Sequence, residues 1–81
     1  MKLFIGGLPY ETSDEDLRKL FEDIGEVVSA KVILDRETGR SRGFGFVEMM
    51  DQADGKKAIE SLDATKIGSR TIVVKKAHDR R

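Results

Sequence analysis

The segment that most constrains the fold is residues 42–49, which read Arg-Gly-Phe-Gly-Phe-Val-Glu-Met. Their alternation predicts a β-strand, in which successive side chains point to opposite faces. One face then carries Arg42, Phe44, Phe46 and Glu48. Charged side chains are seldom buried without a partner, so we expect this face to lie in water. Two exposed phenylalanines beside an arginine are typical of a surface for a planar, anionic ligand, and single-stranded nucleic acid is such a ligand.

Three further strands are predicted from their alternating or β-branched composition, at 2–6, 27–34 and 71–76. The alternation assigns to the core Leu3, Ile5, Ala30, Val32, Leu34, Ile72 and Val74. It assigns to the wet face Lys2, Phe4, Lys31, Ile33, Val73 and Lys75. Phe4 therefore joins the two phenylalanines of the central strand on the exposed side of the predicted sheet.

A first helix is expected to begin after Ser13 and to end before Gly25. The Ser13 side chain can cap the helix by accepting a hydrogen bond from the backbone N–H three residues later, and the Asp16 side chain can accept one from the Ser13 N–H. Apolar side chains at helical spacing form one stripe, made of Leu17, Leu20, Phe21 and Ile24. Gly25 is expected at the position after the helix, where left-handed backbone is common.

A second helix is expected over residues 51–62, with Asp51 and Asp54 as a second capping pair. Its apolar side consists of Ala58, Ile59 and Leu62. Gly55 lies inside this helix, at a cost of about 1 kcal/mol relative to alanine, and a close approach to the sheet would explain it. Residues 63–69 are predicted to be a loop, and the residues after 76 a polar tail.

The order strand, helix, strand, strand, helix, strand predicts an α+β protein with the split βαβ, ferredoxin-like arrangement. Its sheet would be four-stranded and antiparallel, with two helices on one face. Each helix has one apolar stripe, so the pair can cover a single face of the sheet. The other face would remain in water and carry the three phenylalanines. A chain of 81 residues is long enough for one such domain.

The charges of the chain cancel in number but not in position, since it has 15 basic and 15 acidic side chains. Residues 1–30 carry three basic and seven acidic groups, whereas residues 51–81 carry eight and five. This balance argues against a simple polycation and indicates a chain whose C-terminal part is basic. The chain has no cysteine, so no disulfide or thiolate metal site is expected. No apolar run approaches the roughly 20 residues that span a bilayer, and no membrane partner is expected.

Segment 42–49 resembles the octamer motif of the RNA recognition motif family at all but its last place, where Met49 replaces an aromatic residue. Segment 3–8, Leu-Phe-Ile-Gly-Gly-Leu, resembles the hexamer motif of the same family, with Gly7 where asparagine is usual. A third departure is Asp63-Ala64, where the family often has Asn-Gly. By alternation Met49 is expected in the core, so this departure should not affect binding. The resemblance covers essentially the whole chain and is strongest to small single-motif bacterial proteins.

This resemblance implies that Phe4 and Phe46 each stack on a base and that Phe44 packs against sugars. It implies that Arg42 pairs with a phosphate. The other candidate RNA-binding residues are Lys2, Lys31, Ile33, Arg40, Lys75 and Lys76. Tyr10, in the first loop, is equally compatible with packing and with ligand contact. The domain is expected to span residues 1–77, followed by a basic C-terminal tail at 78–81.

The partner implied is single-stranded RNA, and single-stranded DNA is also expected to bind, since stacking does not read the 2′-hydroxyl. We expect a monomer without cofactor or metal. The location expected is the bacterial cytoplasm, or the nucleus if the chain is a domain excised from a eukaryotic protein.

Two other functions remain open, and an enzyme is disfavoured. Some members of the family bind peptides through an Arg-any-Phe element before the last strand, but the corresponding residues 70–72 lack the aromatic. The open sheet face could alternatively form a homodimer that buries the phenylalanines. The lone histidine, His78, lies in the tail, no cysteine nucleophile exists, and no Gly-Lys-Ser/Thr phosphate loop is present.

Overall fold

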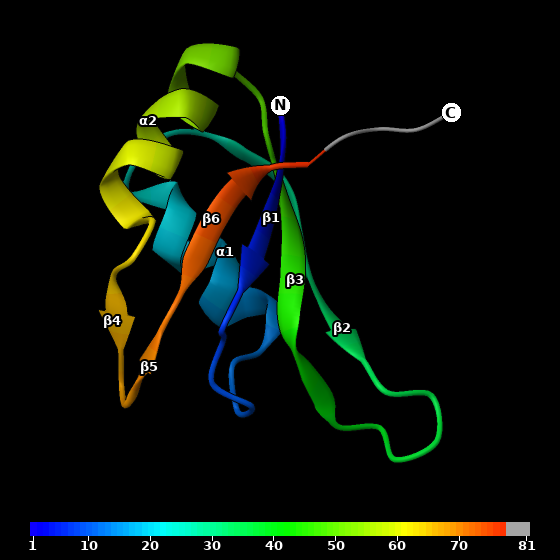
Figure 1. The fold of residues 1–81 in the computed structure, drawn as a ribbon. Coiled ribbons are helices and arrows are strands. Elements are labelled where there is room, and N and C mark those ends of the chain that lie inside the picture. The colour runs from blue at the N-terminus through cyan, green and yellow to red at the C-terminus, as the bar shows by residue number, and fades with distance from the viewer. Residues whose placement is uncertain (78–81) are drawn as a thin grey trace.

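Residues 1–77 are described by a computed structural model, shown in Figure 1. Its elements are β1 (Lys2–Gly6), α1 (Asp14–Glu22), β2 (Val27–Leu34), β3 (Ser41–Met49), α2 (Gln52–Leu62), β4 (Lys66–Ile67), β5 (Arg70–Thr71) and β6 (Val73–Lys76). The predicted strands and helices are therefore present, except that the last strand of the main sheet begins at Val73 and not at Thr71, which belongs to β5. The predicted loop at 63–69 instead contributes to a short hairpin of β4 and β5, which the sequence did not indicate. The tail predicted at 78–81 lies outside the described residues.

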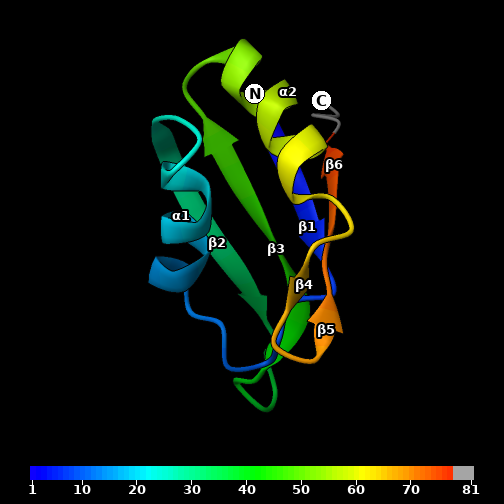
Figure 2. The same ribbon diagram turned by 90° about the vertical axis from the view of Figure 1, so that its left-hand side faces the viewer.

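The main sheet is antiparallel and has the strand order β2-β3-β1-β6. The two strands that carry the aromatic segments, β1 and β3, thus lie side by side in its centre. Both helices lie on the same face of this sheet, as Figure 2 shows. Helix α1 packs against β2 and β3, and α2 packs against β6 and β3. The predicted ferredoxin-like α+β fold is confirmed, and one face of the sheet is left without a helix.

The hydrophobic core lies between the sheet and the helices. Its buried residues are Leu3, Ile5, Leu8, Leu17, Phe21, Val27, Val32, Val47, Met49, Ala58, Ile72 and Val74. Phe21 is fully buried, and Met49 is in the core as its position in the alternation predicts. The core assignments in β1, β3 and β6 are therefore confirmed.

The predicted core assignment is wrong at Leu34, which is 56% exposed. The pairing of β2 with β3 shifts register twice, between Val27 and Ser29 and between Val32 and Leu34. The first shift brings Val27 onto the core face together with Val32. In an unbroken strand, residues separated by an odd number of positions would lie on opposite faces. After the second shift, Leu34 is the last residue of β2, where its side chain lines a cleft together with Tyr10 and Arg42 and is not part of the core.

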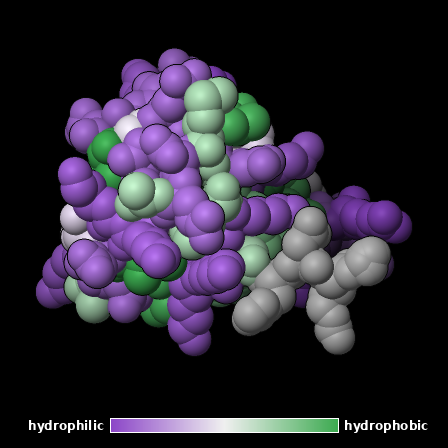
Figure 3. All heavy atoms as spheres, turned by 90° about the horizontal axis from the view of Figure 1, so that it is seen from above, coloured by the Kyte–Doolittle hydropathy of each residue, from purple (hydrophilic) through white to green (hydrophobic). Residues whose placement is uncertain are grey.

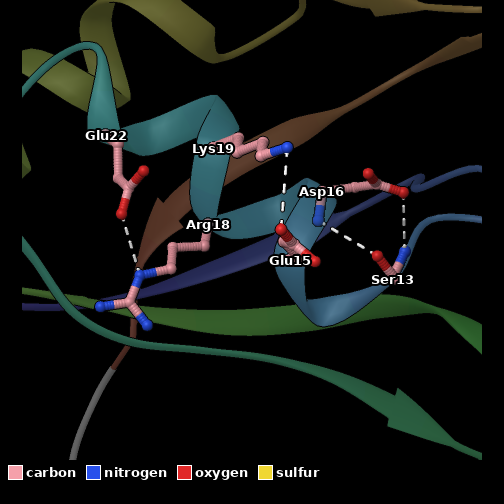
Figure 4. Close-up of polar contacts among 6 residues, drawn as sticks. All are labelled: Ser13, Glu15, Asp16, Arg18, Lys19 and Glu22. Carbon is pink, nitrogen blue, oxygen red and sulfur yellow. Dashed lines mark hydrogen bonds and ion pairs between the residues drawn. The ribbon is translucent and has the colours of Figure 1, made fainter.

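Helix α1 begins as predicted, with a capping box at Ser13 and Asp16. The Asp16 backbone N–H donates to Ser13 Oγ at 3.1 Å, and the Ser13 N–H donates to Asp16 Oδ2 at 3.2 Å (Figure 4). Exposed ion pairs join Arg18 to Glu22 and Lys19 to Glu15. The prediction that Gly25 directly follows the C-cap is wrong, because the C-cap is Asp23 and the residue after it is Ile24. A Cβ at Gly25 would instead collide with the Asp54 side chain, so Gly25 allows the turn after α1 to lie against α2.

Helix α2 begins after Asp51, but the side chain of this residue makes no capping hydrogen bond, so the second capping pair is not formed. A Cβ at Gly55 would collide with the Met1 side chain. The close approach expected at Gly55 is therefore present, and its partner is the residue just before β1. Packing against Met1 accounts for a glycine inside this helix.

The two outer strands of the sheet each have a backbone N–H bound by an aspartate. Asp14, in the first turn of α1, accepts from the N–H of Val32 in β2 at 2.7 Å. Asp63, just after α2, accepts from the N–H of Val74 in β6 at 2.9 Å. Exposed strand edges are liable to pair with other chains. These two carboxylates each bind one backbone N–H group at a strand edge, and they link each helix side of the molecule to its outer strand.

Replacing Ala64 by glycine is expected to stabilise the protein. Ala64 has φ of 63°, in the left-handed region, where a Cβ costs about 1–2 kcal/mol. Glycine adopts this backbone without strain but is more flexible when unfolded, so we expect a net gain of about 1 kcal/mol. For a chain of this size, that gain raises Tm by about 4–8 °C, which thermal unfolding followed by circular dichroism would measure.

The matched control is Ala53→Gly, at an exposed position in α2. There the same substitution is expected to lower Tm, because glycine is less favourable than alanine inside a helix. A fall in Tm for both variants would contradict the left-handed assignment at Ala64.

Candidate nucleic-acid interface

Three phenylalanine rings lie in contact on the sheet face that carries no helix. Phe4 in β1 and Phe46 in β3 are directly opposite each other, with ring centroids 5.7 Å apart and an angle of 63° between the rings. Phe44, two residues before Phe46 on the same strand, lies diagonally across from Phe4, also at 5.7 Å between centroids. All three side chains are partly exposed and none belongs to the core. The prediction from strand alternation, that these three side chains lie on the exposed face of the sheet, is therefore confirmed.

Gly45 explains how this row of rings can lie so close to the helix layer. It separates Phe44 from Phe46 and faces the core, where a Cβ would meet Leu17 of α1 and Val32 of β2, each at 3.1 Å, and would collide with the Lys31 carbonyl oxygen. No side chain fits at this position. The glycine lets α1 pack directly beneath the strand, which holds the two flanking rings on the opposite face.

The pairing register places lysines at both ends of the central aromatic row. Lys31 of β2 is opposite Phe46, Phe46 is opposite Phe4, and Phe4 is opposite Lys75 of β6. Side chains directly opposite across an antiparallel pair share one face. The sheet therefore presents a row of cation, ring, ring and cation, in which an aromatic platform for bases lies between groups that can pair with phosphates.

Two further cations lie over the rings themselves. Lys2 Nζ is 5.3 Å from the centroid of Phe46, and the Arg42 guanidinium carbon is 5.7 Å from that of Phe44. Such cation–π contacts are worth about 0.5–1 kcal/mol at exposed sites. The free protein thus keeps a positive charge beside the Phe46 and Phe44 rings. The sequence placed Lys2 on this face, but no sequence signal indicated that its ammonium group would lie on the Phe46 ring.

The remaining candidate residues do not all lie beside the three rings. Ile33 is partly exposed on β2 at the second register shift, and Arg40 is exposed at the end of the hairpin loop. Lys76 is opposite Leu3, whose side chain is in the core. Lys76 therefore belongs to the helix-covered face at the outer edge of β6. The structure does not group Lys76 with the three rings.

The β2–β3 hairpin is ordered by Asp35. Its carboxylate accepts from the backbone N–H groups of Glu37 at 2.8 Å and Thr38 at 3.2 Å. These two hydrogen bonds, with a smaller contribution from the charge of Arg42, lower the pKa of Asp35 below its ordinary value. A cleft of about 830 Å³ lies between this hairpin and the β1–α1 loop. It is lined in part by Leu34, Arg40 and Arg42, so it adjoins the aromatic surface.

Tyr10 lies at the border between the open face and a second cleft. It is 62% exposed, so it does not act as a core residue, and its ring lies 5.0 Å from the Arg70 guanidinium. The second cleft, of about 500 Å³, lies between the β1–α1 loop, α1 and the β4–β5 hairpin. Arg70, the first residue of the stretch considered for peptide binding, lines this second cleft. Tyr10 lines both this cleft and the hairpin cleft.

Residues 1–77 contain neither a metal-binding cluster nor a membrane-spanning helix. No group of three or more histidine or acidic side chains there is arranged to hold a metal ion. Neither α1, with nine residues, nor α2, with eleven, is long and apolar enough to cross a membrane. A helix-free sheet face with contiguous aromatic rings and cations around them is the arrangement of modules that bind single-stranded nucleic acid.

Comparisons with known proteins identify the family. The model of the RNA recognition motif family matches residues 3–73. The glycine-rich RNA-binding protein 2, mitochondrial, of Arabidopsis thaliana is 53% identical over 79 residues, which cover 98% of this chain and 50% of that protein. The chain therefore belongs to the RNA recognition motif family. This membership agrees with the prediction of a binding module and not of an enzyme.

Solved structures agree with this assignment. The crystal structure of RNA-binding protein PG1 matches with a TM-score of 0.94 at 49% identity, covering 100% of this chain and 98% of that one. The structure of the Rna15 RRM with bound RNA (GU) matches with a TM-score of 0.87 at 28% identity, covering 96% of this chain and 83% of that one. The chain spans about half or less of the length of the curated relatives that it matches.

Proposed function

We propose that this chain binds single-stranded RNA across the open face of its sheet, with two bases stacked on Phe4 and Phe46. The observation that carries the proposal is the contact of the Phe4 ring with the rings of Phe46 and Phe44 on the face without helices. Stacking contributes about 1–3 kcal/mol per base. Two platforms with a few phosphate contacts would give a dissociation constant on the order of 1 μM.

The roles of the surrounding residues follow from their positions. Arg42 would pair with a phosphate and Phe44 would pack against sugars, since they lie together at one end of the aromatic surface. Lys31 and Lys75 would hold the backbone on either side of the central row. Further contacts are proposed for Lys2, Ile33, Arg40 and Lys76. Residues 1–77 would act as the binding domain, with 78–81 as a basic tail.

Single-stranded DNA is proposed as a further ligand, because stacking on the rings does not depend on the 2′-hydroxyl. We also propose that the protein acts as a monomer. The cytoplasmic, bacterial location inferred from the sequence stays a prediction. The relative from Arabidopsis is a plant protein named as mitochondrial, and its location is proposed as the alternative.

The proposed function is tested by titrating a short single-stranded RNA of mixed sequence while following backbone amide shifts by NMR. We expect shifts at the amides of Phe4, Phe44 and Phe46, and small changes on the outer faces of α1 and α2. If RNA causes no shift and the protein tumbles as a dimer, the open face is a homodimer interface. Shifts caused by a peptide, and not RNA, around Arg70 would instead favour the protein-interaction function.

A further inference from the structure

Glu48 is an acidic side chain on a surface that is otherwise suited to phosphates. It is exposed on β3, two residues after Phe46 and therefore on the same face. Its opposite residues are Lys2 on β1 and Ser29 on β2. A carboxylate at this place repels the RNA backbone, so it weakens binding unless it meets hydrogen-bond donors on a base.

Within residues 1–77, Glu48 forms no ion pair and its carboxylate accepts no hydrogen bond. Directly opposite charges usually pair across strands, but the Lys2 ammonium lies over the Phe46 ring instead. The carboxylate therefore faces the ligand side of the sheet with its oxygens available. A structural role as the partner of Lys2 does not account for it.

A cleft of about 620 Å³ lies at this end of the sheet, and Glu48 is part of its wall. Lys2, Lys76, Met50 and Gln52 also line it. Seen from above, the molecule is mostly hydrophilic at this end, with hydrophobic residues scattered among polar ones (Figure 3). On the open face, this cleft combines the Lys2 ammonium, which suits a phosphate, with one carboxylate, which suits N–H donors.

The Glu48 side chain is long enough to contact the edge of a base stacked on Phe46, or the neighbouring nucleotide. Residues two apart on a strand are separated by about 7 Å, so the base edge on that platform lies within reach of a glutamate side chain. RNA bases on such sheets are read by hydrogen bonds to their Watson–Crick edges. Glu48 is therefore placed to contact a base edge while the ring below holds the base plane.

We propose that Glu48 makes this end of the sheet a subsite selective for guanine, an inference that rests on the proposed binding of RNA. An ionised carboxylate accepts hydrogen bonds only. Guanine presents two adjacent donors, N1–H and N2–H, which match the two carboxylate oxygens in a bidentate pair. Uracil presents one N–H between two carbonyl oxygens. Adenine and cytosine present an amino group beside an acceptor nitrogen, which repels the second carboxylate oxygen.

The test compares three heptanucleotide RNAs by fluorescence anisotropy: seven uridines, the same RNA with guanosine at its centre, and the same RNA with inosine there. Inosine keeps N1–H and lacks the N2 amino group. The wild-type protein is expected to bind the guanosine RNA about tenfold more tightly than the uridine RNA, in line with a bidentate base contact. The inosine RNA is expected to fall between the two.

The variant Glu48→Gln is expected to lose most of this preference while binding the uridine RNA as well as the wild type or better. The control Glu60→Gln removes the same charge from the exposed side of α2 and should keep the preference. The proposal is overturned if the wild type does not distinguish guanosine from uridine. It is also overturned if Glu48→Gln strengthens binding to all three RNAs by one factor, since Glu48 would then act only by repulsion. If the wild type binds none of the RNAs, the proposed function itself fails.

Discussion

Replacing Phe46 by alanine is expected to weaken RNA binding at least tenfold with the fold intact. Phe46 lies on the helix-free face beside Phe4, outside the core, so its ring contributes little to packing between sheet and helices. Losing one stacked base costs about 1–3 kcal/mol, and 1.4 kcal/mol is a factor of ten in the dissociation constant. Anisotropy with a labelled RNA measures the affinity, and circular dichroism measures the fold.

The control for this variant is Phe46→Tyr, which keeps an aromatic face and should bind within a few-fold of the wild type. Phe46→Ala also removes the ring beneath the Lys2 ammonium, so Lys2 becomes free to approach a phosphate. The full effect of losing the stacked base is therefore offset in part by this lysine. An unchanged dissociation constant for Phe46→Ala would rule out base stacking on this ring.

Replacing Phe21 by alanine is expected to have the opposite pattern. Phe21, in the last turn of α1, is fully buried in the core, and truncating a buried phenylalanine costs about 3–5 kcal/mol. Small domains have a free energy of unfolding of about 5–15 kcal/mol, so this variant would lose a large part of its stability. Urea unfolding would measure the loss. RNA affinity of the folded fraction at low temperature should stay near that of the wild type.

The two phenylalanine variants together separate the core from the interface. If Phe21→Ala weakened RNA binding in a fully folded sample as much as Phe46→Ala, binding would depend on the helix side of the sheet. Should Phe21→Ala not fold at all, Phe21→Leu keeps most of the side-chain volume and gives a milder loss of stability. Its RNA affinity then provides the same comparison.

Local patterns in the sequence predicted most of the fold. Alternation along a strand fixes which residues share a face, and it placed Phe44 and Phe46 opposite the core residues Val47 and Met49. The capping box at Ser13 and Asp16 also depends only on residues three apart. Both patterns need no knowledge of distant residues, and both were confirmed.

The errors lie where one segment adapts to another. Leu34 was placed in the core because alternation assumes an unbroken register, and β2 pairs with β3 through two shifts. Gly25 is predicted to end α1 at the position after the C-cap, but the cap is Asp23, and the small size of Gly25 serves instead to let the Asp54 side chain approach. The β4–β5 hairpin was missed because its strands have two residues each, too few to produce a recognisable alternation.

In the candidate site too, some features follow from the local sequence and others depend on contacts between distant segments. The sequence by itself determined that three phenylalanines and several cations belong to one face, because strand periodicity is a property of the local chain. Only the tertiary structure decided that Phe4 and Phe46 are directly opposite each other and that the Lys2 ammonium lies over the Phe46 ring instead of pairing with Glu48. These features depend on the register between strands, which is set by the packing of side chains far apart in the sequence.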